Sequence, residues 1–245
     1  MDPRGTHGAH FTPAEREEMY IHTLQYYSRE LKDIPNLILV FAESSGWNLT
    51  RIRQSIPKTF QVEFVSIPTE VFNPSRGKGY NEVLLIKETL LKTPLLDRGF
   101  LKITGRYPIY NLRHFLIEGS LALLKRNKDL YIDIKDHALY ERMGLRWAGR
   151  YADVRIFAST KRFFLQEVVP ELSFLDDREG RFLEGLMYNL VKPRMDQLKY
   201  VYRFLREPHF GGQEGSQIAA FSFSKEQDSF KGKMKRLTGN VLRFI

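Results

Sequence analysis

The sequence predicts an α/β fold in which helices cover both faces of a largely parallel β-sheet. Short apolar runs that are rich in Val, Ile and Phe recur along the first two thirds of the chain, as in buried strands. Segments with apolar residues at helical spacing lie between these runs. Strands that alternate with helices favour a sandwich of parallel strands and crossover helices.

Each element follows from a local pattern. Thr12-Pro13, followed by acidic residues in the first turn, predicts a helix that begins there and continues to about Leu31. The other elements follow from the apolar spacing of their own segments. We expect strands over residues 37–42, 61–67, 100–104, 130–134 and 154–158, and helices over residues 49–56, 83–91, 111–126, 181–190 and from 225 onward.

The composition limits the class of protein. With 245 residues, of which 42% are hydrophobic and 13% aromatic, the chain can bury a large core. It has no cysteine, which excludes disulfide scaffolds, Cys-ligated zinc, iron–sulfur clusters and thiol nucleophiles. No apolar run approaches the ~20 residues of a membrane span and no secretory signal is visible, so we expect a cytoplasmic protein. The simplest division is one domain over residues 1–216 and a C-terminal helix over residues 217–245.

The net charge of +9, from 38 Lys and Arg against 29 Asp and Glu, predicts either an anionic partner or a generally basic surface. Nucleic acid, anionic lipid and a nucleotide diphosphate all fit this charge. Residues 225–245 combine an apolar stripe with flanking Lys and Arg side chains. Such a helix lies on an anionic membrane or docks on the protein core, and both interpretations stay open.

Two segments carry residue types that suit a phosphate group. Residues 75–82 (SRGKGYNE) place two glycines and two cations ahead of a helix, although an exposed loop with a helix cap fits the same spacing. In the strand that ends KITGRY, Lys102 and Thr104 share one face. A lysine in an apolar strand is costly to bury unless its charge is paired, or else it reaches water from a sheet edge.

These segments resemble a group of bacterial glycosyltransferases of the GT-A type, found in lipopolysaccharide, O-antigen and capsule biosynthesis. Residues 152–157 (ADVRIF) are similar to the Asp-x-Arg strand of that group, residues 176–189 to its late acidic helix, and residues 208–216 (PHFGGQEGS) to its glycine-rich acceptor loop. The resemblance covers residues 12–216. It implies a GT-A-like, Rossmann-like αβα sandwich that transfers a sugar from a nucleotide-sugar donor to a surface-polysaccharide acceptor.

The resemblance implies a role for each matching residue. The residues expected at the sugar donor are Arg76, Lys78, Gly79, Glu82, Lys102, Thr104, Gly105 and Arg106, and those expected at the acceptor are Arg155, His209, Gly211 and Gly212. Thr-Gly-Arg stands where many GT-A enzymes carry Asp-x-Asp and a divalent metal. We therefore expect fixed cations to replace Mn or Mg in neutralising the leaving diphosphate, and no cofactor.

A transferase of this kind also needs a general base to deprotonate the acceptor hydroxyl. Glu184 is the first candidate, because it lies beside the apolar stripe of its helix and can face the cleft. An ordinary solvated glutamate fits the same position. Asp153 is the second, and orienting Arg155 is its alternative role. The carboxylate pairs Asp133/Asp136 and Asp176/Asp177 are more typical of solvated loops.

The resemblance further implies an initial strand ahead of the first helix, with its end at the nucleotide base. Residues 1–12 match the loop that follows this strand, so we expect the strand to be encoded upstream of Met1. A lipid-linked acceptor would suit peripheral contact of residues 225–245 with the inner face of the cytoplasmic membrane.

Two non-enzymatic interpretations stand beside the transferase. The cations and aromatic rings of residues 199–203 (KYVYR) fit a basic module for RNA or another anionic polymer, although no RNA-binding signature accompanies them. The transferase itself is expected to bind no nucleic acid. A degenerate transferase that acts as an assembly partner is the other alternative. Either is favoured if Lys102, Arg106 and Glu184 lie away from one common cleft.

Overall fold

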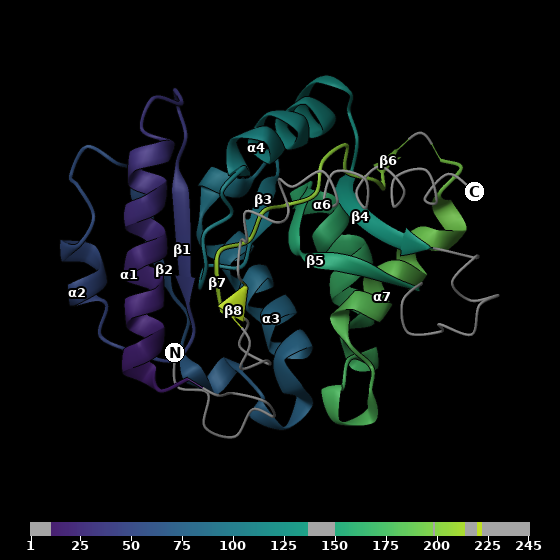
Figure 1. The fold of residues 1–245 in the computed structure, drawn as a ribbon. Helices are drawn as coiled ribbons and strands as arrows, with labels where there is room; N and C mark the ends of the chain where they lie inside the picture. The colour runs from purple at the N-terminus through teal and green to yellow at the C-terminus, as the bar shows by residue number, and fades with distance from the viewer. Residues whose placement is uncertain (1–10, 137–149, 198, 214–219, 222–245) are drawn as a thin grey trace.

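The computed structural model describes residues 11–136, 150–197, 199–213 and 220–221 (Figure 1). The helices are α1 (Pro13–Glu30), α2 (Thr50–Gln54), α3 (Gly77–Lys92), α4 (Leu112–Ser120), α6 (Lys161–Phe163) and α7 (Leu183–Val191). The strands are β1 (Leu39–Glu43), β2 (Val62–Ser66), β3 (Phe100–Ile103), β4 (Leu130–Asp136), β5 (Arg150–Ser159), β6 (Tyr200–Val201), β7 (Gly212–Gln213) and β8 (Ala220–Phe221). This mixture of helices and strands confirms the α/β class.

The first helix begins where the sequence predicts. Thr12 accepts a hydrogen bond from the Glu15 amide at 3.2 Å, and the Glu15 carboxylate accepts one from the Thr12 amide at 2.7 Å. This reciprocal pair is a capping box, and Pro13 occupies the first helical position, where no amide hydrogen bond is lost. The prediction that the first helix begins at Thr12-Pro13 is therefore confirmed.

The strands form separate sheets. β1 and β2 pair in parallel, and a four-stranded sheet has the order β3-β5-β4-β6. β5 is antiparallel to both β3 and β4, whereas β4 and β6 are parallel, so a largely parallel sheet is not confirmed. The reason is that β3 and β4, which α4 connects, run the same way, while β5 is inserted between them in the opposite direction. An apolar run signals burial and carries no information about direction.

Helices cover both faces of the larger sheet. Leu130, Ile132 and Ile134 of β4 point into a core that contains residues of α3 and α7. Tyr131, between them, points into a second core with residues of α1 and α4. This alternation along β4 places the sheet between two helical layers, and Figure 1 shows α7 beside β5 and α3 in the middle of the molecule.

Helical turns that the sequence does not predict follow α6 and continue through Phe164–Val168 and Val169–Phe174. The helix expected from residue 225 onward, and with it the basic stripe, lies outside the described residues. In the part of the chain that is described, no helix is long and apolar enough to cross a lipid bilayer.

Candidate active site

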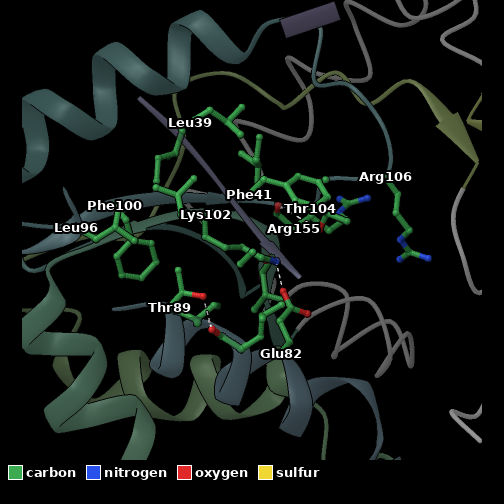
Figure 2. Close-up of a pocket in the computed structure, with 18 of the residues that line it drawn as sticks. Leu39, Phe41, Glu82, Thr89, Leu96, Phe100, Lys102, Thr104, Arg106 and Arg155 are labelled. Carbon is green, nitrogen blue, oxygen red and sulfur yellow. Dashed lines mark hydrogen bonds and ion pairs between the residues drawn. The ribbon is translucent and has the colours of Figure 1, made fainter. Parts of the chain in front are cut away.

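A cleft of about 1910 Å³ lies beside β1 and β3, and it gathers most of the residues expected at the sugar donor (Figure 2). The residues named in the sequence analysis that line this cleft are Lys78, Gly79, Glu82, Lys102, Thr104, Gly105, Arg106, Arg155, Asp177 and Glu184. They come from α3, the end of β3, β5 and α7, which are far apart in the sequence. Lys102, Arg106 and Glu184 therefore share one cleft.

Lys102 is paired, as its position in an apolar strand requires. Its ammonium forms an ion pair with the Glu82 carboxylate and donates a hydrogen bond to the Val154 carbonyl at 2.6 Å. The Lys102 side chain is 10% exposed and that of Glu82 is 33% exposed, so the pair lies at the inner wall of the cleft. Burial of the lysine is tolerated because both partners satisfy its charge.

Arg106 follows the end of β3 and offers an available cation. Thr104 extends the pairing with β5 through its amide, which donates to the Arg155 carbonyl at 3.0 Å. The next residue, Gly105, packs against the ring of Tyr20, where an added Cβ would lie 3.2 Å from a ring carbon. In Figure 2 the Arg106 guanidinium extends away from the labelled side chains. Among the described residues it has no hydrogen-bond or ion-pair partner, so it is free to bind an anionic ligand.

Asp153 does not line the cleft, which argues against its role as general base. It is 4% exposed and accepts hydrogen bonds from the Arg155 guanidinium at 2.8 and 2.6 Å. Although burial alone would raise the pKa of Asp153, the hydrogen bonds and the charge of Arg155 hold it below the usual value. The contacts instead favour the other role given for Asp153, which is to orient Arg155. The Arg155 guanidinium also lies over the Phe210 ring, with its central carbon 4.2 Å from the ring centroid.

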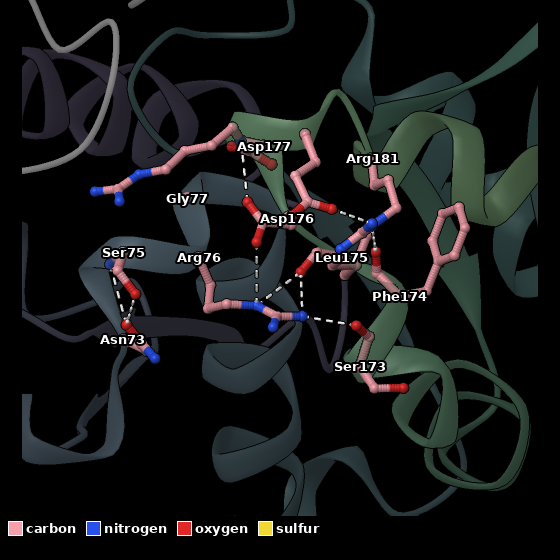
Figure 3. A network of polar contacts seen from close by, with 12 residues as sticks. Asn73, Ser75, Arg76, Gly77, Ser173, Phe174, Leu175, Asp176, Asp177 and Arg181 are labelled. Atoms are coloured by element: carbon pink, nitrogen blue, oxygen red, sulfur yellow. Dashed lines mark hydrogen bonds and ion pairs between the residues drawn. The ribbon is translucent and has the colours of Figure 1, made fainter.

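Arg76 also lies outside the cleft lining, contrary to the expectation that it approaches the diphosphate. Its guanidinium donates hydrogen bonds to the carbonyls of Leu175, at 3.0 and 2.7 Å, and Ser173, at 2.6 Å (Figure 3). The Asp176 carboxylate lies 3.9 Å away. Arg76 therefore holds the segment 173–177 against the start of α3, and the sequence could not show that these segments, about a hundred residues apart, would meet.

The amino end of α3 is already capped by a carboxylate. The Lys78 amide donates to Asp177 Oδ2 at 2.6 Å, and the Gly79 amide lies at 3.4 Å from the same oxygen. The negative charge of Asp177 thus occupies the place where the sequence analysis expected a phosphate. Its other oxygen, Oδ1, is buried and has no hydrogen-bond partner among the described residues. Although Asp177 lines the cleft, this oxygen packs against Gly79 and is not exposed to a ligand.

Glu184 lies in the first turn of α7 and lines the cleft. The residue is exposed, and partial desolvation by the surrounding protein raises the pKa of Glu184. The nearby negative charges of Glu82 and Asp177 add to the increase, and Lys102 opposes it. A carboxylate with a raised pKa is a better proton acceptor near neutral pH than an ordinary glutamate.

The described part of the expected acceptor loop, residues 208–213, does not line the cleft. The His209 amide donates to Asn111 Oδ1 and the Gly211 amide to the Pro108 carbonyl, both at 2.8 Å. The Tyr110 hydroxyl lies close to Gly211, where a Cβ would be 2.4 Å away. Gly212 begins β7. Only Arg155, of the four residues expected at the acceptor, lines the cleft.

Sequence reasoning missed several cleft residues. Arg16 and Tyr20 of α1 and Ser44 and Ser45 after β1 line it. The serines follow a strand end, which is a usual ligand position and could have identified them. The α1 residues fit an ordinary helix surface, so no signal in the sequence pointed to them.

Asp133 does not lie in a solvated loop: it is buried in β4 and forms an ion pair with Lys135. Asp176 caps the turn that follows it. Among the described residues, no group of three or more His, Asp or Glu side chains is placed to hold a metal ion.

The tyrosines of the proposed RNA-binding stretch, residues 199–203, pack against the core. Tyr200 lies edge-on to Phe163, with ring centroids 5.6 Å apart, and Tyr200 and Tyr202 are both packed against the core. This arrangement leaves less ring surface on which bases could stack.

Comparison with known proteins gives no assignment: no protein-family model matches the sequence, and no curated protein matches it. The chemistry of the cleft must therefore carry any statement of function.

Proposed function

We propose that the protein is a glycosyltransferase with a GT-A-like fold, which moves a sugar from a nucleotide-sugar donor to a glycan acceptor of the surface-polysaccharide type. The observation that carries the proposal is the convergence of Lys102, Arg106 and Glu184 on one cleft. Cations that stabilise the leaving group and a carboxylate that accepts the proton of the acceptor hydroxyl are the groups that this reaction needs.

In the proposed reaction the acceptor hydroxyl attacks the anomeric carbon of the donor sugar. Glu184 takes the hydroxyl proton as the new carbon–oxygen bond forms. The bond between the anomeric carbon and the diphosphate oxygen breaks, and the nucleoside diphosphate leaves with its electron pair. Arg106 and Lys102 stabilise the negative charge that develops on this leaving group.

The Glu82 carboxylate limits the positive charge that Lys102 contributes, because the two side chains form an ion pair. Arg106 is the main electrostatic contact in this proposal, since no described side chain neutralises it. Thr104-Gly105-Arg106 occupies the position for which the resemblance implies a metal-binding Asp-x-Asp. We therefore propose transfer without a divalent metal.

The test is nucleotide release from a panel of UDP-, GDP-, dTDP- and CMP-sugars, with water or added glycans as acceptors and EDTA present. We expect one class of donor to be consumed. Glu184→Gln should lower the rate by about 10²- to 10⁴-fold, since it removes the general base. Glu171→Gln is the matched control, because Glu171 is exposed and outside the cleft. Consumption of no donor, or an unchanged rate in Glu184→Gln, would overturn the proposal.

A further inference from the structure

The loop over residues 176–181, which leads into α7, is fixed to the rest of the molecule (Figure 3). The amides of Asp176 and Arg181 each donate to the carbonyl of the other residue at 3.0 Å, so the loop is closed on itself. Asp177 caps the amino end of α3, and Arg76 binds the Leu175 carbonyl just ahead of the loop. The side chains that this loop directs into the cleft are therefore held in place.

Arg178 of the loop lines the cleft and is exposed. Each carboxylate next to it in the sequence is engaged elsewhere. Asp176 accepts a hydrogen bond from the Arg178 amide at 3.1 Å, and Asp177 caps α3. Glu179 forms an ion pair with Arg181. Within the described part of the chain, the Arg178 guanidinium has no hydrogen-bond or ion-pair partner, so it is a further cation available to a ligand.

Phe182, which follows the loop, lines the same cleft with 49% of its surface exposed. Isolated apolar side chains on a protein surface are ordinary, but an exposed aromatic ring in a cleft is a usual ligand contact. Gly180 and Glu184, on either side of it in the chain, line the cleft as well. An added Cβ at Gly180 meets no atom within 4 Å, so the cleft is open at this point.

These two side chains lie where the proposed reaction places the acceptor. Glu184, the proposed general base, is two residues after Phe182 in the first turn of α7. A sugar that gives its proton to Glu184 must lie over this end of the helix. The cleft has room for it beside the donor, because its volume of about 1910 Å³ exceeds the ~300–1,000 Å³ of small-molecule sites.

We propose that Arg178 and Phe182 form an acceptor subsite for an acidic sugar, which is a sugar that carries a carboxylate or a phosphate group. The inference rests on the proposed function, which places the acceptor beside Glu184. The carbon–hydrogen groups on one face of the sugar ring pack on the aromatic face of Phe182. Two oxygens of the acidic group accept hydrogen bonds from the Arg178 guanidinium, whose planar fork matches them.

The charge of the chain favours an acidic acceptor over a neutral one. A neutral sugar would stack on Phe182 equally well but would leave the Arg178 charge unused. The net charge of +9 also speeds the encounter with an anionic glycan. Arg178 is not needed for the donor in this account, because Arg106 and Lys102 already face its diphosphate.

The test is calorimetric titration with glycans in the absence of any donor. The probes are an oligogalacturonate, a mannose oligosaccharide that carries a phosphate ester, and the neutral form of each, made by carboxyl reduction or by dephosphorylation. We expect the wild type to bind one acidic probe about 10-fold or more tightly than its neutral form. The two acidic probes show whether a carboxylate or a phosphate is preferred.

Two variants separate the two contacts. Arg178→Gln should weaken binding of the acidic probe by about 10- to 100-fold and leave its neutral form unchanged, because only the charged hydrogen bonds are lost. Phe182→Ala should weaken both forms by about 3- to 10-fold. The matched controls are Arg98→Gln and Leu205→Ala, which replace an exposed cation and an exposed apolar side chain outside the cleft. Both controls should bind like the wild type.

The subsite is overturned if acidic and neutral probes bind equally, if neither binds, or if Arg178→Gln binds the acidic probe as well as Arg98→Gln does. Its failure is distinct from failure of the proposed function. Consumption of a donor without a preference for acidic glycans counts against the subsite alone. Tight binding of an acidic glycan that depends on Arg178, with no donor consumed, counts against the transferase alone.

Discussion

Lys102 of β3 and Glu82 of α3 form an ion pair at the inner wall of the cleft, and the same ammonium donates a hydrogen bond to the Val154 carbonyl of β5. One side chain therefore connects two strands and a helix at the point where the polar residues of the cleft meet. This pairing fixes the cation in place before any ligand binds, which is the arrangement that electrostatic stabilisation of a leaving group requires.

A double-mutant cycle measures this relationship. Lys102→Met should lower the free energy of unfolding by about 1.5–3 kcal/mol, because it removes charged hydrogen bonds from a mostly buried position. Combined with Glu82→Gln in urea unfolding, it should show a coupling energy of about 0.5–3 kcal/mol. Lys161→Met with Asp97→Asn is the matched control, since that pair is more exposed and should couple by about 1 kcal/mol or less. Equal coupling in both cycles would contradict the structural role of Lys102.

Asp153 should contribute a stability that depends on pH. Its folded-state pKa lies below the usual value, so its contribution is fully present above the unfolded pKa of about 3.9 and is lost as the pH falls through the folded pKa. Asp153→Asn should therefore be destabilising at pH 7, and its difference from the wild type should shrink below about pH 4. Unfolding curves between pH 3 and 7 measure this. A difference that stays constant over this range would show that the Asp153 charge does not stabilise the fold.

The contribution of Glu184 to stability should depend on pH in the opposite direction to that of Asp153. Because its folded-state pKa is raised, its contribution to stability is present below the unfolded pKa of about 4.3 and is lost as the pH rises through the folded pKa. At pH 7 Glu184→Gln should therefore unfold at the same temperature as the wild type or higher, although it loses donor turnover. Thermal unfolding at pH 4 and pH 7 checks the sign. A lower unfolding temperature at pH 7 would point to a structural role.

Two glycines should respond to alanine in opposite ways. Gly77 has φ of +89°, and an added Cβ would overlap Asp177, so Gly77→Ala should lower the free energy of unfolding by more than the ~1–3 kcal/mol of backbone strain alone. Gly185 lies in α7 with no atom near an added Cβ, and Gly185→Ala should raise stability by about 0.5–1 kcal/mol. Urea unfolding compares the two. Equal effects would show that Asp177 does not pack on the start of α3 as described.

Local signals in the sequence predicted the elements well. The capping box at Thr12 and the apolar runs placed α1 and strands β1 to β5 close to their observed positions. The two-residue strands β6, β7 and β8 were not predicted. Strand direction was not predicted, because β5 inserts between β3 and β4 through contacts that no single segment encodes. The helical segments after α6 were not predicted, because each is too short to show the sustained apolar periodicity of a long helix.

The site was predicted in part. Lys102 stood out because an unpaired lysine is unfavourable in an apolar strand, and the structure supplies its partners. Arg76 was placed at the ligand because its glycine-rich surroundings suit phosphate, yet its guanidinium binds Ser173 and Leu175. Contacts between residues so far apart depend on the fold, and neither spacing nor composition reveals them.

The most direct measurement for the proposed function is calorimetric titration with UDP, GDP, dTDP and CMP in the presence of EDTA. It compares the wild type with Arg106→Ala and with Arg126→Ala, an exposed arginine outside the cleft. We predict that one nucleotide binds, that Arg106→Ala weakens it by about 10- to 100-fold through loss of a charged hydrogen bond, and that Arg126→Ala leaves it unchanged. Binding of no nucleotide, or equal affinity in Arg106→Ala and the wild type, would contradict the proposal.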